Sequence, residues 1–205
     1  CTFVHKKDIK FFYKTIRSIA RETAEAKRPI LPEAMLKEIY DNSIGFLLRG
    51  KNHQALYKQY NIPYKRGILL ASPPGCGKTL SCRWLRELCK THGLQHRVVT
   101  MEEYRSAAAH GNTISCFKLP SRGIIFFDDL DVMLKDRKSG NTELGPFLTA
   151  LDGIDSIDGV VNIFTTNYIQ ELDEAFVRPG RIDLFLTFSL PTEKLRRRFI
   201  DETFD

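Results

Sequence analysis

A glycine-rich loop at Ser72–Thr79, with the sequence Ser-Pro-Pro-Gly-Cys-Gly-Lys-Thr, leaves this chain few folds to adopt. The apolar run 67–71 precedes the loop, and residues 79–88 after it have the pattern of a helix. A strand, a glycine-rich loop and a helix in this order are typical of a phosphate-binding loop, or P-loop. The glycines permit unusual backbone angles, so that successive N–H groups and the helix N-terminus face phosphate oxygens. The segment therefore predicts a nucleoside triphosphate site in an α/β domain.

Individual residues of this loop have expected roles. Lys78 is expected to reach the β- and γ-phosphates, and the hydroxyl of Thr79 is an expected ligand of Mg²⁺. The strict motif has glycine where this chain has Ser72, and serine is tolerated there only if its φ is negative. The residues expected to contact the nucleotide are Pro74, Gly75, Cys76, Gly77, Lys78, Thr79 and Leu80. Cys76 is interpreted as a small residue that fits the loop, with a redox-sensitive brake as the alternative.

Four further segments with the pattern of strands, at 97–100, 123–127, 160–165 and 184–188, alternate with helical or polar segments. Continuously apolar strands separated by helices indicate a parallel sheet that is covered on both faces. We therefore expect a three-layer αβα P-loop fold with a five-stranded parallel sheet and a helix near 143–151. Amphipathic patterns at 9–26 and 33–48 predict short N-terminal helices before the sheet.

Two carboxylates, Asp128 and Asp129, follow the apolar run that ends at Phe127. Acidic residues at such a strand end are the expected magnesium-side partner of a P-loop. We expect Asp128 to hold Mg²⁺ together with Thr79, and Asp129 to orient and activate the attacking water. Aspartate is one methylene shorter than the glutamate common at this place, so slow hydrolysis is an expectation too. Asp131 is interpreted as a helix-capping or surface acid.

Polar residues also lie between the runs 160–165 and 184–188. Asn167 comes after the run 160–165, where it would lie between the P-loop and the acidic strand end and hydrogen-bond the γ-phosphate or the water. Arg178 and Arg181 flank a Pro-Gly turn, and planar guanidinium groups suit a phosphoryl group in its transition state. Such arginines at a subunit edge would serve a neighbour's nucleotide, whereas a surface turn with salt bridges is the alternative.

Taken together, these segments resemble the AAA family of ring-forming ATPases over about residues 30–200. The resemblance is carried by the P-loop, by Asp128-Asp129, by Thr165-Thr166-Asn167 and by Arg178-Pro179-Gly180-Arg181, in the order and spacing of the family. Residues 61–67, 74–78 and 151–154 are most similar to the subgroup of the mitochondrial inner-membrane chaperone that installs the Rieske iron–sulfur protein. That subgroup tolerates aspartate at the position of Asp129.

The resemblance implies binding and Mg²⁺-dependent hydrolysis of ATP in a hexameric or heptameric ring of identical subunits. Lys78, Asp129 and Asn167 would be catalytic, with Asn167 as the sensor. Arg178 and Arg181 would act on ATP of the neighbouring subunit while a protein substrate is remodelled at a central pore. The domains implied are a helical segment at 1–29, a large α/β subdomain at 30–190 and the start of a helical lid at 191–205.

Two departures from the family limit these implications. The aromatic pore loop of the family is not visible between Met101 and Phe117, and most of the lid is missing from the sequence. The sequence has no run of about 18 apolar residues, so the membrane role of the subgroup is not carried over and no membrane partner is expected.

Charge and composition leave further alternatives open. The net charge is +6, with eight basic against three acidic residues in 6–28 and a second cluster at Arg196-Arg197-Arg198. Solvated helix faces explain such clusters, but an ATPase acting on nucleic acid, as a loader or a transposition or defence helper, is the alternative. Ser72 and Asp129 favour a third hypothesis, a nucleotide-gated scaffold with weak hydrolysis. The five cysteines form no Cys-x-x-Cys pair, which favours a reducing, cytoplasmic location.

Overall fold

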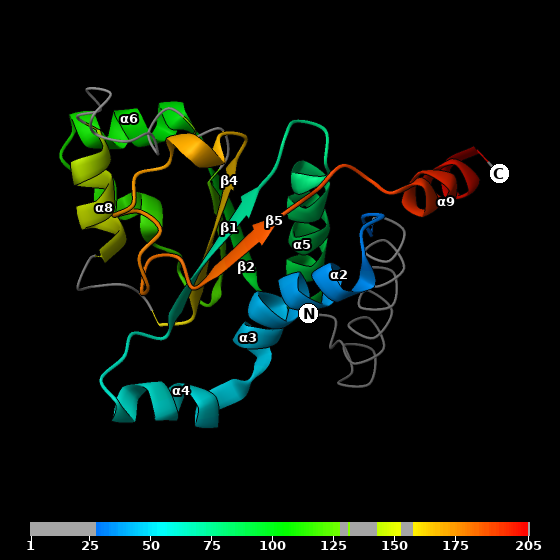
Figure 1. The fold of residues 1–205 in the computed structure, drawn as a ribbon. Coiled ribbons are helices and arrows are strands. Elements are labelled where there is room, and N and C mark those ends of the chain that lie inside the picture. Colours follow the sequence, from blue (N-terminus) through cyan, green and yellow to red (C-terminus); the bar gives the residue numbers. More distant parts are fainter. Residues whose placement is uncertain (1–27, 128–130, 132–142, 153–157, 205) are drawn as a thin grey trace, which may run out of the picture.

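The computed structural model describes residues 28–127, 131, 143–152 and 158–204. The helix expected at 9–26 and most of the polar loop expected at 135–143 lie outside these ranges. Within them, the chain forms a central sheet with helices on both faces (Figure 1).

The sheet has five strands, and every pair of neighbouring strands is parallel. The strands are β1 (Lys65–Ala71), β2 (Gln95–Val99), β3 (Gly123–Phe127), β4 (Val160–Thr166) and β5 (Leu184–Thr187), in the spatial order β2-β3-β4-β1-β5. This arrangement confirms the predicted five-stranded parallel sheet. Because β4 lies between β1 and β3, the segments that follow these three strands start from the same edge of the sheet.

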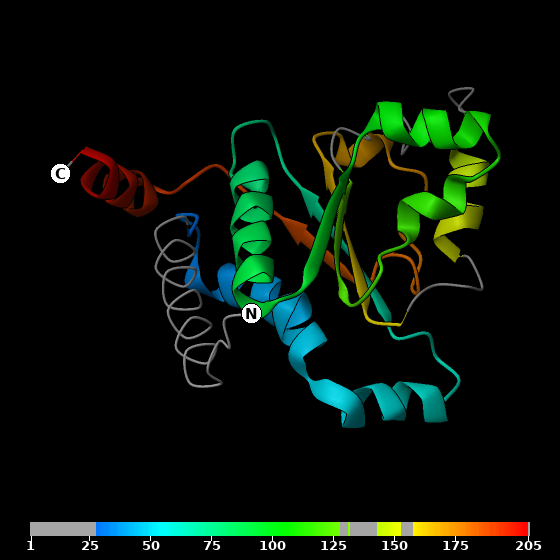
Figure 2. The ribbon, with the colours of Figure 1, turned by 180° about the vertical axis from the view of Figure 1, so that it is seen from behind.

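Helices form the two outer layers. The face that carries α6 (Met101–Ala109) and α8 (Leu144–Asp152) is opposite the face that carries α2 (Glu33–Asn42), α3 (Ile44–Leu48) and α5 (Lys78–His92) (Figures 1 and 2). The short 3₁₀ helix η1 (Thr113–Phe117) packs with α6 and α8, and η3 (Ile169–Glu171) follows β4. Helix α4 (Gly50–Gln59) leads into β1, and α9 (Glu193–Phe204) follows β5. The three-layer αβα architecture is therefore confirmed.

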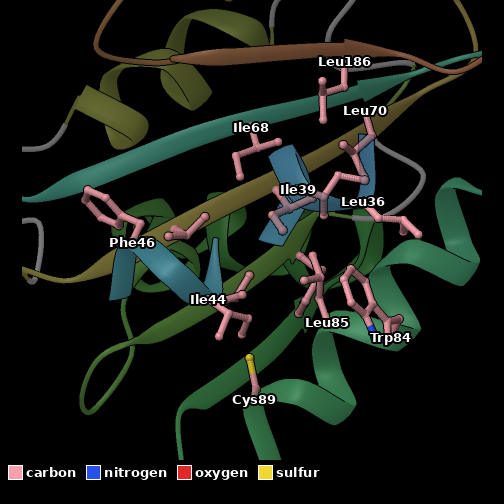
Figure 3. Packing of buried hydrophobic residues seen from close by; sticks show 14 of the residues in the cluster. Leu36, Ile39, Ile44, Phe46, Ile68, Leu70, Trp84, Leu85, Cys89 and Leu186 are labelled. Atoms are coloured by element: carbon pink, nitrogen blue, oxygen red, sulfur yellow. The ribbon is translucent and has the colours of Figure 1, made fainter. Parts of the chain in front are cut away.

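Each face of the sheet has its own hydrophobic core, which explains why successive residues in the strand interiors are apolar. Along β1, Ile68 and Leu70 pack toward α2, α3 and α5, whereas Leu69 packs toward α6 and α8. The first core contains Leu36, Ile39, Ile44, Trp84 and Leu85 (Figure 3). The second core contains a group of aromatic residues, and the rings of Phe127 and Phe164 are stacked at 4.8 Å between centroids.

The N-terminal helical region differs from the predicted single helix at 33–48. The helix ends at Asn42, where the hydroxyl of Ser43 donates to the Ile39 carbonyl oxygen at 2.5 Å and competes with the backbone for it. A second short helix, α3, starts immediately after Ser43, and α4 follows as a helix that was not predicted. Helix α4 has no buried residue, so its sequence has no apolar stripe that would reveal it.

Candidate nucleotide-binding site

The loop between β1 and α5 has the backbone that a phosphate cradle needs. Gly75 and Gly77 have φ values of +81° and +99°, in the left-handed region that favours glycine. Helix α5 begins at Lys78 directly after Gly77, and no acidic residue lies in its first turn. The first N–H groups of a helix have no partner within it, so this end of α5 is suited to an anion.

Ser72, the one departure from the strict motif, is accommodated without strain. Among the described residues other than glycine, only Asn61 has a positive φ, so Ser72 has an ordinary backbone conformation. Its side chain is buried, and its hydroxyl donates to the Pro73 carbonyl oxygen at 2.7 Å while accepting from Lys78 Nζ at 2.7 Å. The serine therefore adds a contact to the loop lysine that a glycine could not make.

The ammonium group of Lys78 is held by four oxygen atoms of the protein. Nζ donates to Ser72 O at 2.8 Å, Ser72 Oγ at 2.7 Å, Pro73 O at 3.3 Å and Asn167 Oδ1 at 2.8 Å. Burial lowers the pKa of Lys78, which is 8% exposed, whereas nearby groups that include the Asp131 carboxylate oppose that shift. The cation is thus already positioned at the loop, surrounded by oxygens that phosphate oxygens could replace.

Asn167 follows β4 directly and connects Lys78 to Asp131. Its side-chain oxygen accepts from Lys78, and its Nδ2 donates to Asp131 Oδ2 at 3.1 Å. The backbone N–H of Asn167 also points to this carboxylate, at 3.2 Å from Oδ1. The structure therefore brings Lys78 and Asn167 together, at the strand end where the sequence predicted that Asn167 would lie.

The interpretation of Asp131 as a helix-capping or surface acid is corrected by these contacts. Asp131 is half-buried and its carboxylate is bonded to Asn167, which is distant in sequence. Asp131 lies only four residues beyond the end of β3, and β3 pairs with β4, the strand that Asn167 follows. That spacing is the signal that could have identified it.

Some of the remaining predicted ligands lie outside the described residues, and others lie at the P-loop and the start of α5. Asp128 and Asp129 lie outside the described residues, so their roles stay predictions. Thr79 is the second residue of α5 and is exposed, as are Pro74 and Leu80. The position of Thr79 beside Lys78 fits a magnesium ligand at a triphosphate.

A cavity of about 610 Å³ adjoins the P-loop and has mostly apolar walls. Its floor is the loop itself, and its walls come from the segment before α2 and from the segment that contains α9. The lining includes Pro29, Ile30, Leu31, Gly75, Cys76, Leu80, Leu195 and Phe199. An apolar space beside a phosphate cradle suits the flat ring of a nucleotide base. Cys76 is buried in the floor of this cavity, which is consistent with its interpretation as a small residue that fits.

The structure does not bring Arg178 and Arg181 to Lys78. Both line a second cavity, of about 420 Å³, together with Lys65 and Arg66 at the start of β1, whereas Lys78 lies beyond the end of that strand. Arg181 donates to Asp152 and to the Ala175 carbonyl oxygen. The side chain of Arg178 is exposed, and among the described residues no partner for it is found.

The basic cluster at 196–198 lies on α9 and is paired within the chain. Arg197 pairs with Glu193 at 2.7 Å, and Arg198 pairs with Glu202 at 2.5 Å. Arg196 donates to the Pro191 carbonyl oxygen at 2.7 Å. These contacts favour a solvated helix face over a surface for nucleic acid.

Comparison with known proteins gives a family match. The model of the ATPase family associated with various cellular activities (AAA) matches residues 68–190, which include the P-loop, Asn167 and both arginines. In the part of the chain that the structure describes, no helix has the length and apolar character to cross a membrane.

Three relatives illustrate the range of similar proteins. A protein named as a cell division cycle ATPase of Plasmodium falciparum is 32% identical over 78% of this chain and 14% of its own length. An AAA ATPase forming ring-shaped complexes from Bifidobacterium dentium is 29% identical over 72% of this chain and 32% of its own. The vesicular-fusion protein SEC18 of Candida albicans is 30% identical over 69% of this chain and 20% of its own length. The chain thus spans less than a third of the length of these relatives.

Proposed function

The chain belongs to the AAA family of ATPases, and from that premise we propose that it binds Mg-ATP at the loop of Ser72–Thr79 and hydrolyses it within a ring of identical subunits. The triphosphate would lie at the start of α5, with its base in the apolar cavity beside Leu31 and Leu80. The work of the assembly would be the remodelling of proteins or protein complexes.

The observation that carries this proposal is the placement of the Lys78 ammonium group. A cation that is 8% exposed and held by four oxygens, next to a helix start with no acidic side chain, is suited to polyanionic oxygens. ATP supplies such oxygens, and exchange of protein oxygens for phosphate oxygens would keep Lys78 satisfied.

The magnesium ion would be held by Thr79 and Asp128. The ion would supply positive charge at the phosphates, which would offset the charge that develops during transfer. Asp129 would orient and activate the attacking water, and Asn167 would assist from the end of β4.

Ring assembly is supported by the name of the Bifidobacterium relative, which forms ring-shaped complexes. Arg178, exposed and remote from the P-loop of its own chain, would then serve the ATP of a neighbouring subunit. A hexamer or heptamer, a cytoplasmic location and the domain limits 1–29, 30–190 and 191–205 belong to the same proposal. So does the likeness to the Rieske-protein chaperone subgroup, which rests on the three short stretches named above.

The two other hypotheses have weaker support. The paired side chains of Arg196, Arg197 and Arg198 remove part of the case for nucleic acid. The unstrained backbone of Ser72 removes part of the case for a scaffold with weak hydrolysis. Slow hydrolysis due to the short side chain of Asp129 stays a hypothesis.

Binding of a fluorescent ATP analogue with Mg²⁺ tests the central claim. Lys78→Ala should abolish binding, because the phosphates lose their buried cation. Lys90→Ala is the matched control, since Lys90 lies near the other end of α5, where its exposed side chain pairs with Glu87. Equal affinity of the Lys78→Ala variant and the parent would refute the proposal.

A further inference from the structure

We propose that Asp131 is a positioning residue for ATP hydrolysis, which orients the side-chain amide of Asn167 so that its oxygen faces the phosphate site. This role rests on the proposed function, and it concerns a carboxylate that neither the P-loop motif nor the predicted magnesium site includes. The two side chains come from different segments, 36 positions apart in sequence.

The chemistry of the two partners of Asn167 fixes the direction of its amide. A carboxylate only accepts hydrogen bonds, and an ammonium group only donates them. An amide with Lys78 Nζ at 2.8 Å on one side and Asp131 Oδ2 at 3.1 Å on the other can satisfy both in one orientation only. The oxygen must face Lys78, and the nitrogen must face Asp131.

Asp131 also holds the main chain at this point. The backbone N–H of Asn167 lies 3.2 Å from Asp131 Oδ1 and 3.4 Å from Oδ2, so one carboxylate binds both the backbone and the side chain of the same residue. Hydrogen bonds to a charged acceptor are stronger than those between neutral groups. The first residue beyond β4 is therefore fixed in position and in the rotation of its amide.

The hydrogen bonds between Asp131 and Asn167 become more important for the orientation of the amide when a nucleotide binds. If Lys78 moves to phosphate oxygens, Asn167 Oδ1 loses its donor, and the bonds to Asp131 are the ones that still orient the amide. The freed oxygen can then accept a hydrogen bond from the attacking water, which orients the water without taking its proton. A rotated amide would present N–H groups instead, and these cannot accept from water.

A double-mutant cycle on the full chain, assembled with Mg-ATP, tests the role. Asp131→Ala should lower kcat about 10- to 100-fold, as expected for a misplaced reacting group, with the KM for ATP little changed. In the Asn167→Ala background, Asp131→Ala should have no further effect on kcat, because the residue acts through Asn167. Asp131→Asn has a single acceptor oxygen in place of two, and should give an intermediate kcat.

Two outcomes would overturn the proposal. One is an unchanged kcat in Asp131→Ala. The other is a loss of kcat in the Asn167→Ala background as large as that in the parent, which would mean that Asp131 acts independently. If Asp131→Ala does not fold, Asp131→Asn carries the same cycle.

The orientation itself can be measured without hydrolysis, in the nucleotide-free ¹⁵N-labelled chain. The side-chain ¹⁵N–¹H signals of Asn167 should shift in Asp131→Asn, and unshifted signals would overturn the positioning role. A parent that binds ATP without hydrolysing it would contradict the proposed function, whereas this measurement would still decide whether Asp131 orients the amide of Asn167.

Discussion

The guanidinium group of Arg181 donates to both carboxylate oxygens of Asp152, the last residue of α8, with Nε 2.8 Å from Oδ1. Arg181 is mostly buried, with 18% of its side chain exposed. Arg178, three positions earlier, is exposed, and no partner for its side chain is found within the described ranges. The two arginines predicted to serve a neighbouring subunit therefore differ, since one is bound within its own chain and the other is available.

We expect Arg178→Ala to lower ATP hydrolysis by the assembled ring about 10³-fold, the scale of a lost arginine supplied in trans. The melting temperature should not change, because the exposed side chain has no hydrogen bond or ion pair to lose in the described chain. Arg83→Ala is the control, because Arg83 is also an exposed arginine but lies on α5, and this variant should retain activity.

Mixing Arg178→Ala subunits with Asp129→Asn subunits tests the same prediction across an interface. Some sites in mixed rings then combine an intact Asp129 with an intact Arg178 from the neighbour. Partial recovery of steady-state hydrolysis is expected, and mixtures without any recovery would argue against a role in trans.

The Arg181–Asp152 pair should contribute modestly to stability. About half of the Asp152 side chain is exposed, and such pairs contribute about 0–1 kcal/mol. Asp152→Asn should therefore lower the melting temperature by no more than about 2–4 °C. The comparison is Asp41→Asn, which breaks a more exposed pair with Lys37 and should have a smaller effect.

The pH dependence of this pair has a definite sign. The hydrogen bonds from Arg181 hold the pKa of Asp152 below its ordinary value of 3.8. The stability that the Arg181–Asp152 pair contributes is thus fully present above that pH, and it is lost as the pH falls through the lowered pKa of Asp152. Thermal melts of parent and Asp152→Asn should differ by a constant amount from neutral pH down to about 4. A difference that vanishes well above pH 4 would contradict this account.

Gly67 is the position at which β1 meets the turn that carries both arginines. A Cβ atom built on Gly67 would lie 1.6 Å from the carbonyl oxygen of Arg181, which is backbone and cannot rotate away. Gly67→Ala should therefore destabilise the fold by more than about 4 kcal/mol, measured by urea unfolding.

Gly145→Ala is the matched control for that substitution. Gly145 lies in the first turn of α8, and nothing described lies within 4 Å of an added Cβ atom. Alanine there should be neutral or stabilising by up to about 1 kcal/mol. Similar unfolding curves for the two alanine variants would show that the contact between an added Cβ atom at Gly67 and the Arg181 backbone does not destabilise the fold.

The sheet could be predicted from the sequence because each strand is recognised from the residues of its own segment. Most strands contain a run of apolar residues, and the run at 123–127 has the same bounds as β3. The run at 97–100 was displaced by about two residues from β2, whose first residues are not apolar. A run of apolar residues predicts the position of a buried strand well, but it predicts the polar ends of the strand poorly.

The contacts that complete the site depend on tertiary structure, and the sequence alone did not reveal them. The bond between Asp131 and Asn167 joins segments 36 positions apart, and the pair of Arg181 and Asp152 joins segments 29 apart. Both acidic residues would look like surface residues in an isolated segment. The need for glycine at Gly67 is likewise set by the backbone of Arg181, which the strand pattern does not contain.

Tyr104 of α6 offers a last prediction, because its hydroxyl is buried without a hydrogen-bond partner in the described structure. The residue is 1% exposed, and burial raises the pKa of Tyr104 from 10.0 to about 12. A buried polar group without a partner costs free energy, so Tyr104→Phe should stabilise the fold by about 1 kcal/mol at neutral pH.

Tyr64 is the matched control, since it is equally buried but its hydroxyl donates to the Phe46 carbonyl oxygen at 2.7 Å. Tyr64→Phe should destabilise by about 1–2 kcal/mol, because it leaves that oxygen without its donor. The size of the effect of Tyr104→Phe also depends on pH. Above pH 10 the unfolded chain loses the phenolic proton while the folded chain keeps it, so the parent loses stability up to about pH 12. The advantage of Tyr104→Phe in urea unfolding should therefore grow between pH 9 and 11, and a constant or shrinking advantage would place the hydroxyl in contact with water.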